Sequence, residues 1–167
     1  LPRELELVKV DGRYVLASKV VREIENIASE WETITDGSLG SHDAYQLRLT
    51  VDMTKENTWR LSNGKNEYLE FYVNPGARMI VARRNGSTGA SSFSASFSLP
   101  ALRMPVEGNE DTIELDIFVD RSSVEFFTAD GTSAMTMIVF PEEIYDSIGS
   151  TSGVIDGKVR SLARIWK

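Results

Sequence analysis

Carboxylates are the side chains of this chain that could do chemistry. The sequence contains 25 aspartate and glutamate residues, one histidine (His42) and no cysteine. Hydrolysis of a glycosidic bond needs two carboxyl groups held at a defined separation across a sugar-sized cleft, and no motif here marks such a pair. One histidine cannot build a multi-histidine metal site, and without cysteine there is no disulfide or thiolate chemistry. We therefore predict no catalytic residue, no metal site and no cofactor.

Three charged residues in the middle of the chain are candidate site residues. Asp120 and Arg121 stand at a turn, where an ion pair between them would fix the backbone; the alternative is that they bind a sugar or contact a partner domain. Glu125 follows on the strand face opposite Val124 and Phe126, where it either reaches a sugar hydroxyl or stays in solvent. Exposed ion pairs at turns are common and individually weak, which favours the structural role.

Three aromatic residues complete the candidate set, because rings with a few polar neighbours suit sugar binding. Trp59 and Tyr72 belong to alternating segments in the middle of the chain. Phe118 and Phe127 point away from the side of their strands that is expected to be buried. Either a second layer such as residues 19–32 covers these two rings, or they form an exposed apolar patch that marks an interface.

The elements that must position these residues are strands. Apolar side chains alternate from Ile113 to Val119, which places one set on the core face of a strand. Turn-forming residues follow at 120–123 and at 129–131, each succeeded by another alternating segment. Residues 112–141 therefore form a meander of three antiparallel strands.

The rest of the chain repeats this rhythm. Turn signals at short spacing predict a hairpin over residues 5–17 and strands near 45–51, 59–61, 68–73, 78–83 and 93–99, with an exposed loop at 85–92. Residues 19–32 are the exception, because Val20, Ile24, Ile27 and Trp31 fall at helical spacing. We expect a short helix or irregular crossing there, with Trp31 in the core. The prediction is a single domain over residues 1–167: an all-β, two-sheet antiparallel sandwich of the jelly-roll or concanavalin-like kind.

The same meander resembles the C-terminal β-sandwich of glycoside hydrolase family 32, which contains invertases, inulinases and levanases. The similarity lies in VDRSSVEF at residues 119–126, the Asp130-Gly131 turn, and the AMT and FP pieces at 134–136 and 140–141. Residues 1–5 (LPREL) resemble the segment that opens this sandwich, and residues 159–166 resemble the strand that closes it.

The resemblance implies a division of labour within a longer protein. Catalysis in the family belongs to an N-terminal five-bladed propeller with WMNDPNG-like, RDP and EC motifs, and this chain has neither an Asp-Pro dipeptide nor a cysteine. The implied role is a non-catalytic accessory domain that stabilises the propeller, and the parent would cleave β-fructosidic bonds with retention. A fructan-binding module is the alternative. The propeller is the implied partner, with fructan or a second copy as further partners, at an extracellular, cell-surface or periplasmic location.

The net charge of the chain limits which classes of partner it can bind. The net charge is −7 and the isoelectric point is about 4.8. Nucleic acid demands a basic patch, and an anionic membrane surface attracts basic segments. We therefore expect neither nucleic acid nor membrane as a partner, whereas a neutral polysaccharide is compatible with this charge.

Overall fold

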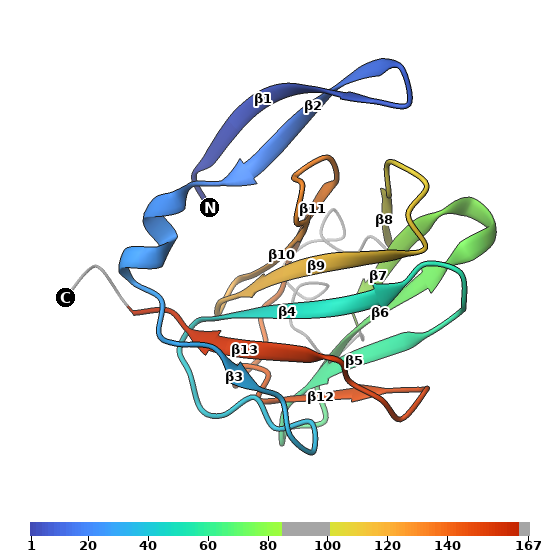
Figure 1. The fold of residues 1–167 in the computed structure, drawn as a ribbon. Coiled ribbons are helices and arrows are strands. Elements are labelled where there is room, and N and C mark those ends of the chain that lie inside the picture. Colours follow the sequence, from blue (N-terminus) through green and yellow to red (C-terminus); the bar gives the residue numbers. More distant parts are fainter. Residues whose placement is uncertain (85–100, 164–167) are drawn as a thin grey trace.

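Residues 1–84 and 101–163 are described by the computed structural model, and most of them lie in strands (Figure 1). The strands are β1 (Arg3–Val10), β2 (Arg13–Val20), β3 (Glu32–Thr33), β4 (Tyr45–Asp52), β5 (Thr58–Ser62), β6 (Tyr68–Asn74), β7 (Met79–Arg84), β8 (Leu102–Pro105), β9 (Thr112–Val119), β10 (Ser123–Thr128), β11 (Ala134–Ile138), β12 (Ser147–Ser150) and β13 (Gly157–Ser161). Two short 3-10 helices accompany them, η1 (Arg22–Asn26) and η2 (Pro75–Ala77).

Two antiparallel sheets form the sandwich. One is six-stranded in the order β11-β10-β9-β4-β13-β3, and the other is five-stranded in the order β12-β5-β6-β7-β8. The predicted meander supplies β9, β10 and β11, which pair as neighbours at one side of the six-stranded sheet. β4 then pairs with β9, so segments far apart in the sequence lie side by side. The predicted two-sheet sandwich is confirmed.

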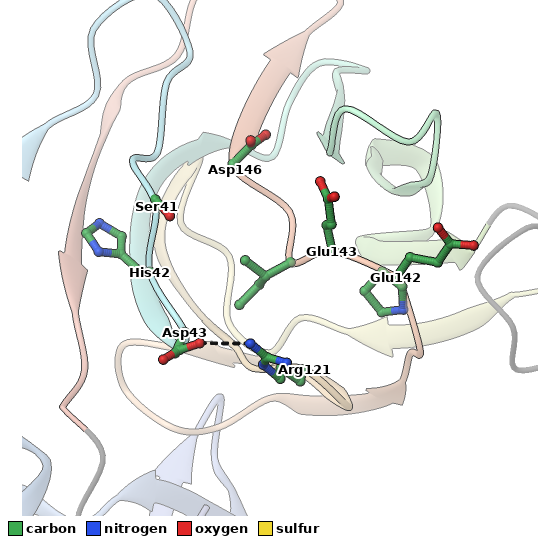
Figure 2. Close-up of a pocket in the computed structure, with 9 residues that line it drawn as sticks. Ser41, His42, Asp43, Arg121, Glu142, Glu143 and Asp146 are labelled. Carbon is green, nitrogen blue, oxygen red and sulfur yellow. Dashed lines mark hydrogen bonds and ion pairs between the residues drawn. The ribbon is translucent and has the colours of Figure 1, made fainter.

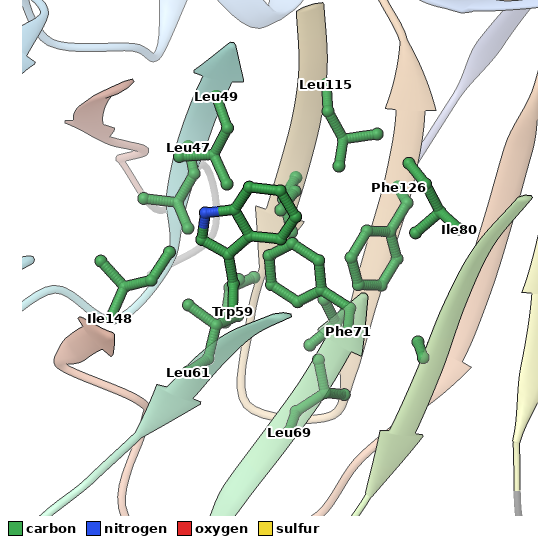
Figure 3. Close-up of a cluster of buried hydrophobic side chains, with 14 of the residues drawn as sticks. Leu47, Leu49, Trp59, Leu61, Leu69, Phe71, Ile80, Leu115, Phe126 and Ile148 are labelled. Carbon is green, nitrogen blue, oxygen red and sulfur yellow. The ribbon is translucent and has the colours of Figure 1, made fainter. Parts of the chain in front are cut away.

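The core lies between the sheets (Figure 3). In the long strands of the two sheets, such as β4 and β6, every second residue points inward, as the alternation requires. Phe71 on β6 stands at its centre, stacked on Trp59 at 5.4 Å with an interplanar angle of 11° and meeting Phe126 edge-on at 5.4 Å. The fully buried side chains around this aromatic group include Leu47, Leu49, Leu61, Leu69, Ile80 and Leu115.

The first two strands form a separate two-stranded hairpin. Figure 1 shows it above the part of the six-stranded sheet that β9, β10 and β11 form, with η1 leading from its end back to the sandwich. Residues 19–32 thus form the predicted short crossing, although β2 extends to Val20 and η1 has only five residues. The placement of Trp31 in the core was wrong: its ring lies half-buried on the outer face, with Arg160 and Lys158 over it. The chain is extended near Trp31, so the helical period does not continue that far.

The strand at 93–99, the loop at 85–92 and the closing Trp166 lie outside the described residues. Among the described residues there is no helix with the length and apolarity that crossing a membrane requires.

Candidate functional sites

The outer face of the six-stranded sheet carries polar and aromatic side chains that are buried rather than exposed to solvent. Phe118 and Glu125 are direct register partners on β9 and β10. Phe118 is 5% exposed and meets the ring of Phe127 edge-on at 5.8 Å. The guanidinium of Arg3, on the hairpin, lies 4.8 Å from the centre of the Phe127 ring. A second layer therefore covers these rings, as the first of the two sequence-based alternatives proposed.

Glu125 holds this layer in place. Its carboxylate accepts hydrogen bonds from Arg3 Nη2 at 2.7 Å and from Thr136 Oγ1 at 3.3 Å. Burial alone would raise the pKa of Glu125, but hydrogen bonds to its carboxylate, including the one from Arg3, outweigh it and leave the pKa below its ordinary value. The expected solvated or sugar-binding glutamate is instead an ionised clamp for the hairpin.

A second contact ties the hairpin to the turn between β10 and β11. Ser18 donates its backbone N–H to the carbonyl oxygen of Gly131 at 2.7 Å. Gly131 has a φ of +74°, and a Cβ placed there would lie 2.6 Å from Lys19 Cγ. The backbone of β2 therefore passes so close to this turn that glycine suits the position on both counts.

A third contact joins η1 to β13, which lies on the other side of β4 from β9 in the same sheet. Arg160 on β13 donates from Nη1 and Nη2 to the two carboxylate oxygens of Glu25, each at 2.6 Å. Its Nε donates to Gln46 at 2.8 Å, and Gln46 in turn donates to Asp116 at 3.1 Å. Arg48 completes the chain with two bonds to Asp116, at 2.7 and 2.8 Å. The hydrogen bond from Arg160 is the main cause of a lowered pKa at Glu25.

Asp120 and Arg121 do not pair with each other. Asp120 Oδ1 accepts the backbone N–H groups of Ser122 and Ser123 at 2.6 and 2.7 Å, which fixes the corner between β9 and β10. Arg121 points away and pairs with Asp43 at 3.1 Å, as Figure 2 shows. The predicted Asp120–Arg121 ion pair is wrong, because the aspartate is already used by its own turn.

The Arg121–Asp43 pair borders a cavity of about 430 Å³ between three loops at one end of the sandwich (Figure 2). Glu142, Glu143 and Asp146 supply its other carboxylates. Within residues 1–84 and 101–163, no group of three or more histidine and carboxylate side chains is arranged to hold a metal ion.

The remaining two candidates lie on the five-stranded sheet, on opposite faces. Trp59 points inward and is 4% exposed. Tyr72 on β6 points outward, where Arg83 donates to its hydroxyl at 3.0 Å and lies 5.0 Å from its ring centre. The structure therefore brings together Phe118 and Glu125 beneath the hairpin but leaves Trp59, Tyr72 and the Asp120–Arg121 corner at separate places.

Residues that sequence reasoning missed carry the hairpin contacts. Arg3, Gly131, Glu25 and Arg160 come from four distant segments. The sequence contains one signal of this layer: Phe118 and Phe127 lie on the outward side of their strands, where large apolar rings favour a covering element. That signal did not say which side chains would hold the layer down.

Fold and contacts together define a class of protein: an antiparallel β-sandwich with a hairpin clamped to one of its two sheets. The chain belongs to the glycosyl hydrolase family 32 C-terminal domains, whose family model, "Glycosyl hydrolases family 32 C terminal", matches residues 16–166. The family resemblance seen in the sequence is thereby confirmed.

Curated relatives are longer proteins. The chain is 27% identical to a levanase of Bacillus subtilis (strain 168) over 188 residues, which covers 99% of the chain and 27% of the levanase. It is 26% identical to a sucrose-6-phosphate hydrolase of Zymomonas mobilis, covering 94% of the chain and 31% of that enzyme. The chain spans about a quarter to a third of the length of these two relatives.

Solved structures share the fold. The exo-inulinase from Aspergillus awamori superposes with a TM-score of 0.79 at 22% identity, over 99% of this chain and 36% of the inulinase. The sucrose-6-phosphate hydrolase from Lactobacillus gasseri gives a TM-score of 0.74 at 23% identity, over 98% of this chain and 33% of that one.

Proposed function

We propose that this domain is the non-catalytic accessory sandwich of an enzyme that hydrolyses fructans or sucrose. Its N-terminal hairpin would dock onto the catalytic domain of the same protein. The matches to a levanase and to sucrose-6-phosphate hydrolases support the substrate class. The accessory role is supported by the family model, which describes a C-terminal domain.

One observation carries the docking role: the hairpin exposes an apolar stripe on the face turned away from the sandwich. Leu7 and Leu16 are register partners, with Leu5 and Tyr14 two residues away on the same face. Their exposed fractions are 68% for Leu7, 56% for Leu16, 66% for Leu5 and 74% for Tyr14. Contiguous exposed apolar side chains of this size mark an interaction surface.

The opposite face of the hairpin is already used. Ala17 on that face is fully buried, and Arg13 forms an ion pair with Glu107. An isolated two-stranded hairpin is marginal in water, so the polar clamps to the sandwich hold it in shape. The stripe is thereby presented outward on a supported element, ready to bury its leucines against a partner.

The test compares the same substitutions in the isolated domain and in the full-length enzyme. Leu7→Ser with Leu16→Ser removes the centre of the stripe, and Val154→Ser is the matched control because Val154 is an equally exposed apolar residue on the sandwich, 67% exposed. In the isolated domain each variant should stay within about 0.5 kcal/mol of the parent, as surface substitutions do.

In the full-length enzyme the double substitution should lower stability by about 1.5 kcal/mol or more, because each leucine buried at the interface contributes hydrophobic free energy. Val154→Ser should have no such effect. Equal melting temperatures for the double variant and the control would contradict docking. A dimer of the isolated domain that dissociates on the double substitution would assign the stripe to self-association instead.

A further inference from the structure

A second cavity, of about 420 Å³, opens at the sandwich end where the β4–β5 and β12–β13 loops meet. Its volume falls within the range of small-molecule sites. Trp59 and Val154 supply apolar surface, and the other lining residues are polar: Thr50, Asp52, Lys55, Glu56, Asn57, Thr112, Ser152 and Asp156. The hairpin contributes no residue to this lining, so the cavity is separate from the proposed docking stripe.

Two N–H donors at this cavity lack a protein acceptor. Trp59 is 4% exposed, and among the described residues its Nε1 donates no hydrogen bond; the ring contacts Phe71 by stacking. Trp59 lines the cavity, and its Nε1 is not among the sealed, unpaired side-chain atoms of the described residues, which are Arg78 Nε and Tyr145 Oη. An unsealed indole N–H without a protein acceptor is free to donate to water or to the oxygen of a ligand.

Asn57 provides the second donor. Its Oδ1 accepts hydrogen bonds from Ser150 Oγ, Thr151 Oγ1 and the backbone N–H of Ser152. Its Nδ2 donates to no residue in the described ranges 1–84 and 101–163. The oxygen therefore holds the β12–β13 loop in position while the amide N–H groups remain available, so this wall of the cavity is preorganised.

Acceptors surround these donors, and their charge selects the ligand. Asp52, Glu56 and Asp156 are carboxylates, against the single cation Lys55, which lies 3.1 Å from Asp52. This excess of negative charge repels phosphate groups. Sugar hydroxyls both donate and accept hydrogen bonds, and the C–H faces of a sugar suit the apolar surface of Trp59 and Val154.

We propose that this cavity binds one or two units of a neutral oligosaccharide, with Trp59 Nε1 and Asn57 Nδ2 as donors to its oxygen atoms. The cavity would give the accessory domain a sugar subsite of its own. None of its lining residues belongs to the hairpin.

Nuclear magnetic resonance of the ¹⁵N-labelled domain tests the proposal directly. The chain has three tryptophans, so three indole N–H signals are expected, and Trp59→Phe assigns one of them. Titration with sucrose, 1-kestose and levan oligosaccharides should shift the Trp59 signal saturably and leave the other two in place. Sucrose 6-phosphate should bind more weakly than sucrose at low salt, and the difference should shrink as salt screens the carboxylates.

Variants measured by calorimetry separate this cavity from other sites. Trp59→Phe keeps an aromatic ring and removes the donor, and should weaken binding about five-fold, the loss of one hydrogen bond. Asn57→Asp keeps the loop-holding oxygen and removes the donor, and should weaken binding at least as much. Arg121→Ala, which borders the other cavity, is the control and should leave the affinity unchanged.

The proposal is overturned if none of the neutral sugars moves the Trp59 signal. It is equally overturned if sugars bind but Trp59→Phe and Asn57→Asp keep the parent affinity. Should Trp59→Phe fail to fold, the sugar affinities of Asn57→Asp and Val154→Asp replace its result. Asn57 is partly exposed and Val154 largely exposed, so both substitutions should leave the fold intact, and unchanged affinity in both would overturn the proposal.

Discussion

Arg3 and Glu125 are 122 residues apart in the sequence, yet Arg3 Nη2 lies 2.7 Å from Glu125 Oε2. The pair joins the start of the hairpin to the strand that carries the family-like VDRSSVEF segment. Arg3 also donates to Thr136 at 3.1 Å and covers the ring of Phe127. Glu125 therefore serves to place the hairpin, and through it the apolar stripe that we propose for docking.

Replacing this carboxylate should loosen the hairpin. Glu125→Gln keeps the shape but removes the charge that Arg3 faces, and should cost about 1.5–3 kcal/mol, the range for hydrogen bonds that involve a charged group. Limited proteolysis within residues 1–20 should accelerate, while the sandwich strands stay protected. Thr136→Val, which removes a weaker partner of the same carboxylate at 3.3 Å, is the milder comparison. Unchanged cleavage in Glu125→Gln would contradict the clamp.

The same clamp should respond to acid. The pKa of Glu125 in the folded protein is lowered, so its stabilising contribution is fully present above the ordinary glutamate pKa and is lost as the pH falls through the lower, folded-state pKa. Hairpin cleavage should therefore rise below about pH 4. In Glu125→Gln this pH dependence should be reduced. A parent protein whose hairpin protection is constant across this range would argue against an ionised Glu125.

Glycine at the hairpin seat offers a second test. Gly131 and Gly12 both have positive φ, +74° and +84°, but a Cβ at Gly131 would lie 2.6 Å from Lys19 Cγ whereas one at Gly12 meets nothing within 4 Å. Gly12→Ala should cost about 1 kcal/mol, the penalty of the left-handed conformation for an L-residue. Gly131→Ala should cost more, because it also displaces β2. Urea denaturation of both variants measures the difference, and equal costs would show that β2 does not pack closely on this turn.

Much of the fold could be predicted because each strand buries one face. Alternation from Ile113 to Val119 predicts which face of β9 is buried, and the turn residues at 120–123 and 129–131 mark where the neighbouring strands begin and end. The pairing of β4 with β9 was beyond such reasoning, since strands distant in sequence choose partners through the shape of the whole core.

The candidate sites were less predictable for a physical reason. Phe127 looks the same in sequence whether it faces solvent or a covering hairpin, and the residue that covers its ring, Arg3, is more than a hundred residues away. Asp120 and Arg121 are adjacent in sequence and opposite in charge, so the sequence alone favours an ion pair between them. In the structure the Asp120 carboxylate instead accepts hydrogen bonds from backbone N–H groups of its own corner, at 2.6 and 2.7 Å.

These neighbouring residues should therefore behave differently on substitution. Asp120→Ala removes the acceptor for two backbone N–H groups, and should destabilise the domain by about 1–2 kcal/mol, as loss of a capping side chain does. Arg121→Ala removes an ion pair whose side chains are 74% and 51% exposed, and should cost less than about 0.5 kcal/mol. Thermal melting of the two variants gives the comparison. A larger loss for Arg121→Ala would mean that the Arg121–Asp43 pair, not the turn, holds this corner.

The last prediction concerns the hydrogen-bond network under η1. Loss of the donor to the buried Gln46 amide should destabilise the domain more than loss of the Glu25 charge. Arg160→Met preserves side-chain volume but leaves Gln46, which is 2% exposed, without the donor to its Oε1, and should cost about 1–3 kcal/mol. Glu25→Gln disturbs the other end of the same guanidinium. The Arg160 side chain is only 5% exposed, but the glutamine oxygen still accepts one of its two hydrogen bonds, so the cost should be about 1 kcal/mol, the loss of one hydrogen bond.

Urea denaturation compares the two variants, and titration by nuclear magnetic resonance adds a second measurement. In Arg160→Met the pKa of Glu25 should rise toward its ordinary value, since the hydrogen bond from Arg160 is the main cause of its lowering. A Glu25→Gln variant less stable than Arg160→Met would show instead that the ion pair, rather than satisfaction of Gln46, holds η1 against the sheet.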